Sequence, residues 1–448
     1  MSHMQKFTLP PEGSSFYFIG VLGAGMMPLA RFLLSRGYSV WGSDTRAPEN
    51  PLPEGLDFIR GHSPDRLTDT DVCVFSLAVP YDDPELCRAA ELGIRCVSRP
   101  ELLGAVVESF PRSVAVAGSH GKSTVTAMLA TLLGELRPTV LCGAGIGCDG
   151  FVSGDRDLLV YEACEYRDAF LSTRPTIALL LNLELDHTDY FEDISALESS
   201  FSRFAASAVR VVYNADDTRL SRICRGLDSV GFGRGEGAFY RCVALDGRRF
   251  GIFRDGVSLG ESELSILGDF NLMNAVAAAA ISAELGISPQ GICKALAEYK
   301  GIPRRLERLG LLDGAPVLYD YAHHPSEISA GIDAVRSAFG GEITVAFRPH
   351  TYSRTESLMT EFICALGKAD RVIILDVFAA RERVRECADS AALAKAIGKR
   401  ACYVATQSEA ADILLRGHNG ALILMGAGDI SELKEKIEKN LDKTHAPC

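Results

Sequence analysis

The strongest constraint on this chain is the segment Gly118–Thr124, which reads GSHGKST and lies between a predicted strand and a predicted helix. The small and β-branched residues at 114–117 are typical of a buried parallel strand, and residues 125–130 favour a helix. A glycine-containing turn at such a junction directs backbone N–H groups and the positive end of the helix at one point. The segment therefore predicts a site for phosphate groups.

Side chains of the same segment add to this prediction. Lys122 contributes a full positive charge, while Ser123 and Thr124 contribute hydroxyls that can reach Mg²⁺ or a phosphate oxygen. Loops of this kind usually carry a first glycine five residues before the Gly-Lys pair, where this chain has Val116. We interpret the segment as a compact loop for a nucleotide triphosphate; a plain glycine turn with a surface lysine is the alternative.

The length and composition of the chain restrict the number of domains and the kinds of partner that it can have. A chain of 448 residues predicts about three domains of roughly 150 residues each. The net charge of −12, without any basic block, disfavours nucleic acid as a partner. No apolar run reaches the roughly 18 residues that cross a bilayer, and the N-terminus lacks a signal-peptide pattern, so we expect a cytoplasmic protein without a membrane partner. The 13 cysteines are scattered singly, which predicts small, buried, reduced thiols.

A β-α-β unit is predicted at the start of the chain. A strand at 16–19 leads into the glycine-rich turn GVLGAG at 20–25, a helix follows to residue 35, and a second strand ends at Asp44. The glycine spacing differs from the dinucleotide fingerprint. Binding of a nucleotide or nucleotide sugar is favoured, while NAD binding and simple packing remain alternatives. We expect this first domain to end at residue 111.

Acidic residues and a histidine follow two strands of the predicted second domain. The strand at 158–161 leads into Glu162, and the apolar strand at 176–183 leads into a polar segment that contains His187. The carboxyl ends of parallel strands form the crevice where such sheets bind ligands, and Mg²⁺ prefers oxygen ligands beside phosphates. Glu162 and His187 are therefore candidate metal ligands, although His187 could equally be a packing residue at the end of a strand.

The remainder of the second domain contains two further features. Residues 229–266 read as short strands with glycine turns, which predicts a small antiparallel appendage. Asn271 and Asn274 are three residues apart near the start of an alanine-rich helix, so they share one face of it. Their carboxamides could recognise the edge of a base, but helix capping is the favoured alternative.

A third α/β domain is predicted from residue 305 onward. A strand at 317–320 leads into the polar cluster Tyr321–Pro325, which suits contact with a substrate or phosphate. Another strand at 343–347 is followed by Arg354, whose guanidinium could hold a carboxylate through two hydrogen bonds. A solvent-facing arginine is the alternative for Arg354.

Together these segments resemble the Mur ligases, the ATP-dependent amide-forming enzymes of peptidoglycan synthesis. The resemblance spans almost the whole chain and rests on ordered blocks, which are GVLGAGM, GSHGKST, EACEYRDAFL, NLELDHTDYF, GDFNLMNA, DYAHHPSEI, FRPHTYSRT and GAGDI. It implies a three-domain α/β fold. The expected domains are a Rossmann-like, UDP-sugar-binding domain at 1–111, a central P-loop ATPase-type domain with a parallel sheet at 112–304, and a Rossmann-like, amino-acid-binding domain at 305–448.

The resemblance also implies roles for individual residues. The implied catalytic residues are Lys122, His187, Arg305 and His323. The implied ATP-binding residues are Gly118, Ser119, His120, Gly121, Lys122, Ser123, Thr124, Asn271, Asn274, Arg305 and Asp320. The expected substrate-binding residues are Gly23, Ala24, Gly25, Met26, Asp44, Ser76, Tyr321, His323 and Arg354. The implied metal ligands are Ser123, Glu162 and His187.

The implied reaction uses ATP and Mg²⁺ and joins L-alanine to UDP-N-acetylmuramate through an acyl phosphate, in a monomer or homodimer. A related ligase that attaches a recycled peptide, a nucleotide-triggered binding switch and a dehydrogenase are the alternatives. No general base is assigned. Two departures from the family pattern concern the ligand sites: Phe270 stands where a histidine is common, and Thr351 stands where many members have a second arginine.

Overall fold

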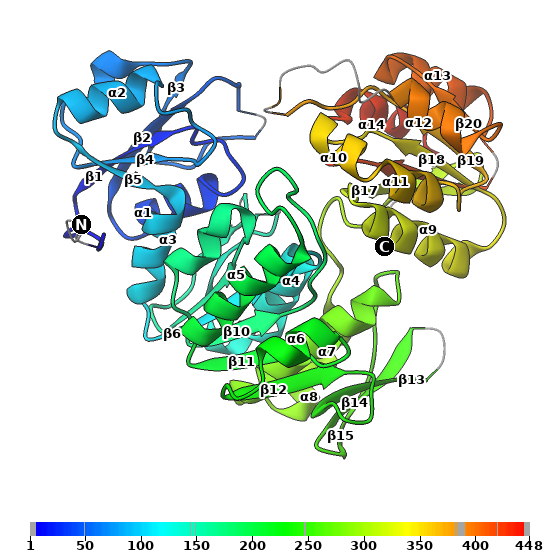
Figure 1. The fold of residues 1–448 in the computed structure, drawn as a ribbon, viewed down its shortest axis with the longest axis horizontal. Coiled ribbons are helices and arrows are strands. Elements are labelled where there is room, and N and C mark those ends of the chain that lie inside the picture. The colour runs from blue at the N-terminus through cyan, green and yellow to red at the C-terminus, as the bar shows by residue number, and fades with distance from the viewer. Residues whose placement is uncertain are drawn as a thin grey trace.

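The computed structural model describes residues 6–48, 50–143, 145–147, 149–245, 248–380, 382, 390–418 and 420–442. In this part of the chain the strands form three sheets, which we call the sheets of the first, second and third lobes. Figure 1 shows the lobes in blue, in cyan to green, and in yellow to red along the chain. The predicted three-part α/β fold is confirmed.

The first lobe is a parallel sheet of order β3-β2-β1-β4-β5. Its elements are β1 (Ser15–Ile19), α1 (Met27–Ser35), β2 (Ser39–Asp44), β3 (Leu56–Arg60), the 3₁₀ helix η1 (Pro64–Arg66), β4 (Val72–Phe75), α2 (Pro84–Glu91), β5 (Arg95–Ser98) and α3 (Arg99–Glu108). Strand β1 pairs with β2 on one side and β4 on the other, so the strand order reverses there. Ligands of such sheets bind at this switch point, outside the carboxyl ends of the strands.

The second lobe is built on a sheet of order β15-β14-β13-β12-β11-β10-β6-β9-β7-β8. Its strands are β6 (Arg112–Ala117), β7 (Thr139–Leu141), β8 (Phe151–Val152), β9 (Leu158–Glu162), β10 (Ile177–Leu180), β11 (Arg210–Asn214), β12 (Ser229–Gly233), β13 (Tyr240–Ala244), β14 (Arg249–Arg254) and β15 (Val257–Glu263). Its helices are α4 (Lys122–Leu132), η2 (Gly134–Leu136), η3 (Tyr166–Ser172), α5 (Ile194–Ser207), α6 (Thr218–Ile223), α7 (Phe270–Glu284) and α8 (Pro289–Glu298). Its central strands β10, β6 and β9 are parallel and end near one another.

The prediction of a small antiparallel appendage at 229–266 is correct for only part of this segment. Strand β12 pairs in parallel with β11, and β13 pairs in parallel with β12, so both continue the main sheet. Only β14 and β15 add in antiparallel orientation at its edge. A strand's sequence pattern shows which face is buried but not which neighbour accepts its backbone hydrogen bonds, and this is why the sequence did not show that β12 and β13 continue the main sheet.

The third lobe has a sheet of order β16-β17-β21-β18-β19-β20, in which only the edge strand β16 is antiparallel to its neighbour. Its strands are β16 (Glu307–Leu312), β17 (Ala315–Asp320), β18 (Ile343–Phe347), β19 (Arg371–Ile374), β20 (Ala401–Tyr403) and β21 (Ala421–Met425). Its helices are α9 (Pro325–Phe339), α10 (Tyr352–Ser357), α11 (Met359–Leu366), α12 (Ser390–Ile397), α13 (Gln407–Arg416) and α14 (Ser431–Glu438).

Apolar packing joins the first two lobes. One buried cluster runs from Phe16 and Leu102 in the first lobe to Phe170 and Phe201 in the second. Helix α3 approaches η3 so closely that a Cβ atom on Gly104 would lie 2.3 Å from the Ser172 carbonyl oxygen. The third lobe has apolar clusters of its own on both faces of its sheet. The first lobe is therefore fixed on the second by a shared core.

Two sequence predictions concern the membrane and the thiols. For the membrane, none of the helices in the described ranges is long and apolar enough to cross a bilayer. The cysteines placed by the structure form no disulfide with one another, and Cys73, Cys142, Cys224 and Cys242 are buried as expected. Cys87, Cys364 and Cys402 are exposed, so the prediction of small buried thiols holds for only part of the set.

Candidate active site

The loop between β6 and α4 depends on two glycines. Gly118 and Gly121 have φ angles of 146° and 85°, which side chains rarely adopt. A Cβ atom on Gly121 would also lie 2.8 Å from Oδ1 of Asn274. The hydroxyl of Ser119 donates to the Glu184 carbonyl oxygen at 2.8 Å and accepts from the Glu184 N–H at 2.9 Å. The predicted turn is thus present, and it is fastened to the segment after β10.

Lys122 points back into this loop from the first position of α4. Its ammonium group donates to the Gly118 carbonyl oxygen at 2.5 Å and contacts both carboxylate oxygens of Glu165 at 3.0 Å. Burial would lower the pKa of Lys122, but the charge of Glu165 outweighs burial and raises it. The side chain of Glu165 is 2% exposed, so a buried carboxylate holds the Lys122 ammonium at the start of α4 and offsets its charge.

The three expected metal ligands come from three elements around this loop. Ser123 is buried in the first turn of α4, Glu162 ends β9, and His187 follows β10 with a φ of 55°. The thiol of Cys142 donates to Glu162 at 2.9 Å. A Cβ atom on Gly143 would lie 2.8 Å from the other Glu162 oxygen, so a larger residue there would crowd this carboxylate. Hydroxyl and carboxylate oxygens fit Mg²⁺.

His187 has aromatic and acidic surroundings. Its ring lies 4.7 Å from the ring of Tyr166, and its Nε2 lies 4.0 Å from a carboxylate oxygen of Glu165. A quarter of its side chain is exposed. The residue is therefore not buried in a core, which favours the ligand interpretation over the packing alternative.

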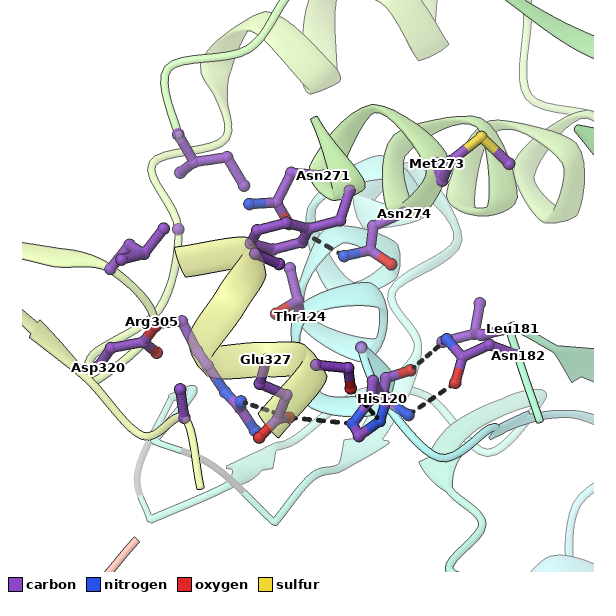
Figure 2. A pocket seen from close by; sticks show the side chains of 18 of the residues that line it. His120, Thr124, Leu181, Asn182, Asn271, Met273, Asn274, Arg305, Asp320 and Glu327 are labelled. Atoms are coloured by element: carbon purple, nitrogen blue, oxygen red, sulfur yellow. Dashed lines mark hydrogen bonds and ion pairs between the residues drawn. The ribbon is translucent and has the colours of Figure 1, made fainter. Parts of the chain in front are cut away.

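A smaller cavity, of about 260 Å³, opens between α4, α7 and the third lobe (Figure 2). Among its lining residues are His120, Gly121, Thr124, Phe270, Asn271, Asn274, Tyr299, Arg305, Asp320 and Glu327. Asn274 donates to the side-chain oxygen of Asn271 at 2.9 Å, and Asn271 donates to the Leu267 carbonyl oxygen at 2.6 Å. Neither side chain caps α7, so the capping alternative, which the residues alone favoured, is wrong.

Charged groups from the third lobe complete the wall of this cavity. Asp320 ends β17 and is buried, which raises the pKa of its carboxyl to about 7 even though Arg305 opposes that change. The guanidinium of Arg305 lies 3.6 Å from the carboxylate of Glu327. The cavity thus has amide groups of the second lobe on one wall, and a cation and two acids at the third lobe on the other. This lining suits a base, a ribose and phosphates.

A larger cavity, of about 790 Å³, lies where the first lobe meets the second. Its lining includes all the substrate-binding residues expected in the first domain, namely Gly23, Ala24, Gly25, Met26, Asp44 and Ser76. Glu162 and Tyr166 from the second lobe and Phe378 from the third also line it. The carboxylate of Asp44 accepts the Leu22 N–H at 3.1 Å and therefore holds the glycine-rich turn against β2.

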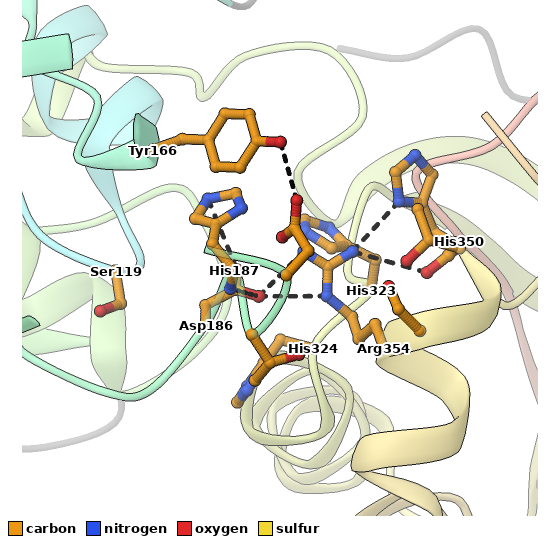
Figure 3. A network of polar contacts seen from close by, with 12 residues as sticks. Ser119, Tyr166, Asp186, His187, His323, His324, His350 and Arg354 are labelled. Atoms are coloured by element: carbon orange, nitrogen blue, oxygen red, sulfur yellow. Dashed lines mark hydrogen bonds and ion pairs between the residues drawn. The ribbon is translucent and has the colours of Figure 1, made fainter. Parts of the chain in front are cut away.

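Arg354 does not face solvent. It lies in α10, is 8% exposed, and donates through Nε and Nη2 to one oxygen of Asp186 at 3.1 and 2.9 Å (Figure 3). Its Nη1 contacts Nδ1 of His350 at 3.1 Å. Burial would raise the pKa of Asp186, but the charge of Arg354 holds it far below the usual range. The expected carboxylate-binding arginine is thus already paired with a carboxylate of the second lobe.

His323 lies beside this pair, and the ring of Tyr321 lies next to that of His323. The Nδ1–H of His323 donates to the Tyr321 carbonyl oxygen at 3.0 Å, which leaves the lone pair on Nε2. Burial lowers the pKa of His323 to about 4, so its ring is neutral at pH 7. The Tyr321 ring lies under the guanidinium groups of Arg304 and Arg305, at 4.5 and 5.3 Å from its centroid.

Comparison with known proteins decides the family. The model described as "Mur ligase family, catalytic domain" matches residues 15–111, "Mur ligase middle domain" matches 116–282, and "Mur ligase, glutamate ligase domain" matches 304–428. This chain belongs to the Mur ligase family. The matches follow the three sheets in order, so each lobe of this Mur ligase corresponds to one family model.

Similar proteins cover nearly the whole Mur ligase chain. The UDP-N-acetylmuramate–L-alanine ligases of Acetivibrio thermocellus and Caldanaerobacter subterraneus are each 35% identical, over 96% and 95% of this chain and 97% of theirs. The crystal structure of UDP-N-acetylmuramate–alanine ligase from Thermotoga maritima has a TM-score of 0.80 at 26% identity, covering 95% of this chain and 98% of that one. A murein peptide ligase from Psychrobacter arcticus shares the fold, with a TM-score of 0.75 at 21% identity over 97% of this chain and 100% of that one.

Three acidic residues of this Mur ligase site were given no individual role from the sequence. They are Glu165 beside Lys122, Asp186 beside Arg354, and Glu327 beside Arg305. Glu327 follows His324 at the three-residue spacing of a capping box, but the pattern is usually sought with serine or threonine in first place. Partners of this kind come from distant parts of the chain, so no local pattern joins them to the residues that they contact.

Proposed function

We propose that this Mur ligase joins L-alanine to the lactyl carboxylate of UDP-N-acetylmuramate with ATP as the energy source. The observation that supports this most is the full-length similarity to UDP-N-acetylmuramate–L-alanine ligases, at 35% identity. The smaller cavity is lined by part of the phosphate-type loop and the larger one by Glu162, which agrees with a reaction between a nucleotide and a second large substrate. In this proposal the segments 1–111, 112–304 and 305–448 bind the UDP-sugar, ATP and the amino acid, respectively.

ATP would lie in the smaller cavity. Asn271 and Asn274 would contact the adenine, and Asp320 the ribose, while the N–H groups of Gly118–Thr124 and the ammonium of Lys122 would hold the phosphates. Arg305 would contact the terminal phosphate from the other wall. Transfer of that phosphate to a carboxylate brings anions together, and fixed cations are the main means of lowering such a barrier.

Ser123, Glu162 and His187 would hold Mg²⁺ between the two cavities. When bound, Mg²⁺ neutralises charge on the phosphates and on the carboxylate that they approach. Glu162 lines the larger cavity, beside the place where the UDP-sugar would lie, which supports this position. The protein's own contribution is to bring the lactyl carboxylate into line with the phosphate and to exclude water from the resulting acyl phosphate.

The amine of alanine would then attack the carbonyl carbon of the acyl phosphate, so that an amide bond forms, the bond to the phosphate oxygen breaks and inorganic phosphate leaves. Arg354 would hold the alanine carboxylate, which requires it to share or exchange its bond with Asp186, because Nε, Nη1 and Nη2 all have partners. His323 is neutral with a free lone pair on Nε2, and it lies close to Arg354. This makes its ring suitable for holding or accepting a proton of the incoming amine.

The test is release of ADP by the purified protein with ATP, Mg²⁺ and UDP-N-acetylmuramate across a panel of amino acids and short peptides. We expect release that depends on alanine, with a matching product mass. Release that depends on a tripeptide and not on alanine would support a peptide-attaching ligase instead, and release that ignores every amine would contradict a ligase of either kind.

A further inference from the structure

Glu327 brings together groups that the proposed ATP site uses. It lies in the first turn of α9, in the third lobe, and it lines the smaller cavity (Figure 2). One carboxylate oxygen lies 3.2 Å from Nδ1 of His120 and 3.6 Å from Nη1 of Arg305. The other accepts the backbone N–H groups of His323 and His324 at 3.1 and 3.3 Å. One side chain of the third lobe thus reaches the phosphate loop of the second.

His120 is held from both lobes. Its Nε2 lies 3.2 Å from the carboxylate of Glu184 in the second lobe and 3.2 Å from the hydroxyl of Ser326 in the third. Its ring lies 4.9 Å from the ring of His324. These contacts, with the one to Glu327, are polar, and polar interfaces between lobes separate more readily than apolar ones. The environment of His120 should therefore change when the third lobe moves away from the second.

The charges around His120 also indicate that acidic groups of both lobes hold this side chain. Burial would lower its pKa, but hydrogen bonds to Glu184 and Glu327 raise the pKa to about 9, so the ring is charged at pH 7. Burial would raise the pKa of Glu327, but its basic neighbours hold it well below the usual value. The charge of Glu327 likewise raises the pKa of Arg305 against burial. Two cations, His120 and Arg305, and two anions, Glu184 and Glu327, therefore form a single unit beside the loop.

We propose that Glu327 is a positioning residue of this ligase: when the third lobe docks, its carboxylate holds His120 and Arg305 in place beside the terminal phosphate of ATP. This inference rests on the proposed function. Glu327 itself carries a negative charge and would not bind the phosphate; it acts through the two cationic side chains. When the third lobe docks, it therefore also completes the site for the terminal phosphate.

A simpler role for Glu327 is to cap α9, because it forms a capping box with His324. The chain offers a matched control for that role. Glu101 forms the same capping box with Ser98 at the start of α3, is exposed, and is absent from the lining of both cavities. A Glu101→Gln variant therefore measures what the loss of a capping carboxylate does by itself.

The experiment compares Glu327→Gln with Glu101→Gln in the full chain. We expect kcat/KM for ATP to fall at least about tenfold in Glu327→Gln and less than about twofold in Glu101→Gln, because only the first variant releases the two cations. The KM for UDP-N-acetylmuramate should stay unchanged in both. Glu327→Asp, which retains the charge on a shorter side chain, should recover part of the loss.

A second readout is the ¹⁵N resonance of the His120 imidazole during a pH titration. We expect the ring to lose its proton at lower pH in Glu327→Gln than in the wild type, and to be unaffected in Glu101→Gln. If Glu327→Gln fails to fold, the same titration of the Glu327→Asp variant decides the matter. An unchanged His120 titration, or ATP kinetics equal to those of Glu101→Gln, would overturn the inference.

The wild-type reaction, measured beside the variants, keeps the two proposals separate. If the wild type releases no ADP in response to alanine, the proposed function is wrong. If the wild type is active and Glu327→Gln matches the Glu101→Gln control, only the role of Glu327 is wrong.

Discussion

The guanidinium of Arg354 and the carboxylate of Asp186 form a buried ion pair across the boundary between the third and second lobes, at 2.9 Å. Each side chain is only 10% exposed. The carboxylate of Asp186 occupies the kind of position that a substrate carboxylate would take on Arg354. In the proposed function, binding of the amino acid and the contact between the lobes would depend on the same guanidinium.

Removal of this guanidinium should affect alanine more than ATP. We expect Arg354→Ala to raise the KM for alanine at least about tenfold while the KM for ATP changes by less than about twofold, because the two substrates use different walls of the site. Steady-state ADP release measures both constants. Equal changes in the two constants would remove Arg354 from the amino-acid site.

The variant Asp186→Asn serves as the control for that experiment. It weakens the same contact between the lobes but leaves the guanidinium in place. If Arg354 binds alanine directly, Asp186→Asn should not raise the KM for alanine. A rise of equal size in both variants would show that Arg354 matters only through the position of the third lobe.

Lys122 should be essential for ADP release. We expect Lys122→Ala to lower kcat by at least about 10²-fold, because the fixed cation at the phosphates is lost. The variant also leaves Glu165, which is 2% exposed, without its cation, so it should unfold at a lower temperature. The double variant Lys122→Ala, Glu165→Gln should regain stability without regaining activity. Near-normal ADP release by either variant would contradict the role of Lys122.

Asn274 should determine the affinity for ATP. We expect Asn274→Ala to raise the dissociation constant of ATP by about tenfold, since a hydrogen bond to the base and the bond to Asn271 are lost together. Binding of UDP-N-acetylmuramate, measured by calorimetry, should not change, because Asn274 does not line the larger cavity. An unchanged ATP affinity would contradict the placement of the adenine against α7.

The stability of the docked third lobe should fall at alkaline pH. The pKa of His120 in the folded chain is about 9 against 6.5 in the unfolded chain, because Glu184 and Glu327 face it, with His324 and Ser326 alongside. A raised pKa stabilises the fold fully below pH 6.5, and this contribution is lost as the pH rises through 9. Thermal unfolding should therefore begin at lower temperature at pH 9.5 than at pH 6.5.

A His120→Asn variant provides the control for this pH dependence. It should show a smaller change in unfolding temperature between pH 6.5 and pH 9.5 than the wild type, because the titrating ring is absent. An identical slope in both proteins would assign the pH dependence to other groups.

Much of the fold followed from local patterns. The strand before Gly118, the helix after it, and the strands leading into Glu162 and Asp320 were predicted and are present, because buried parallel strands are apolar runs that end in polar residues. The same patterns missed how β12 and β13 join the main sheet. The side-chain pattern of a strand does not show which neighbouring strand its backbone pairs with.

The sequence by itself determined the three-lobe α/β plan, the phosphate loop with its lysine, and the family, because each depends on residues that are neighbours in the chain. Only the tertiary structure decided which acid each cation meets: Glu165 for Lys122, Asp186 for Arg354, and Glu327 for His120 and Arg305. These partners lie far apart in the sequence, so the electrostatics of the site exist only once the lobes are folded and docked. Charge interactions depend on distance in space, and a sequence records only order along the chain.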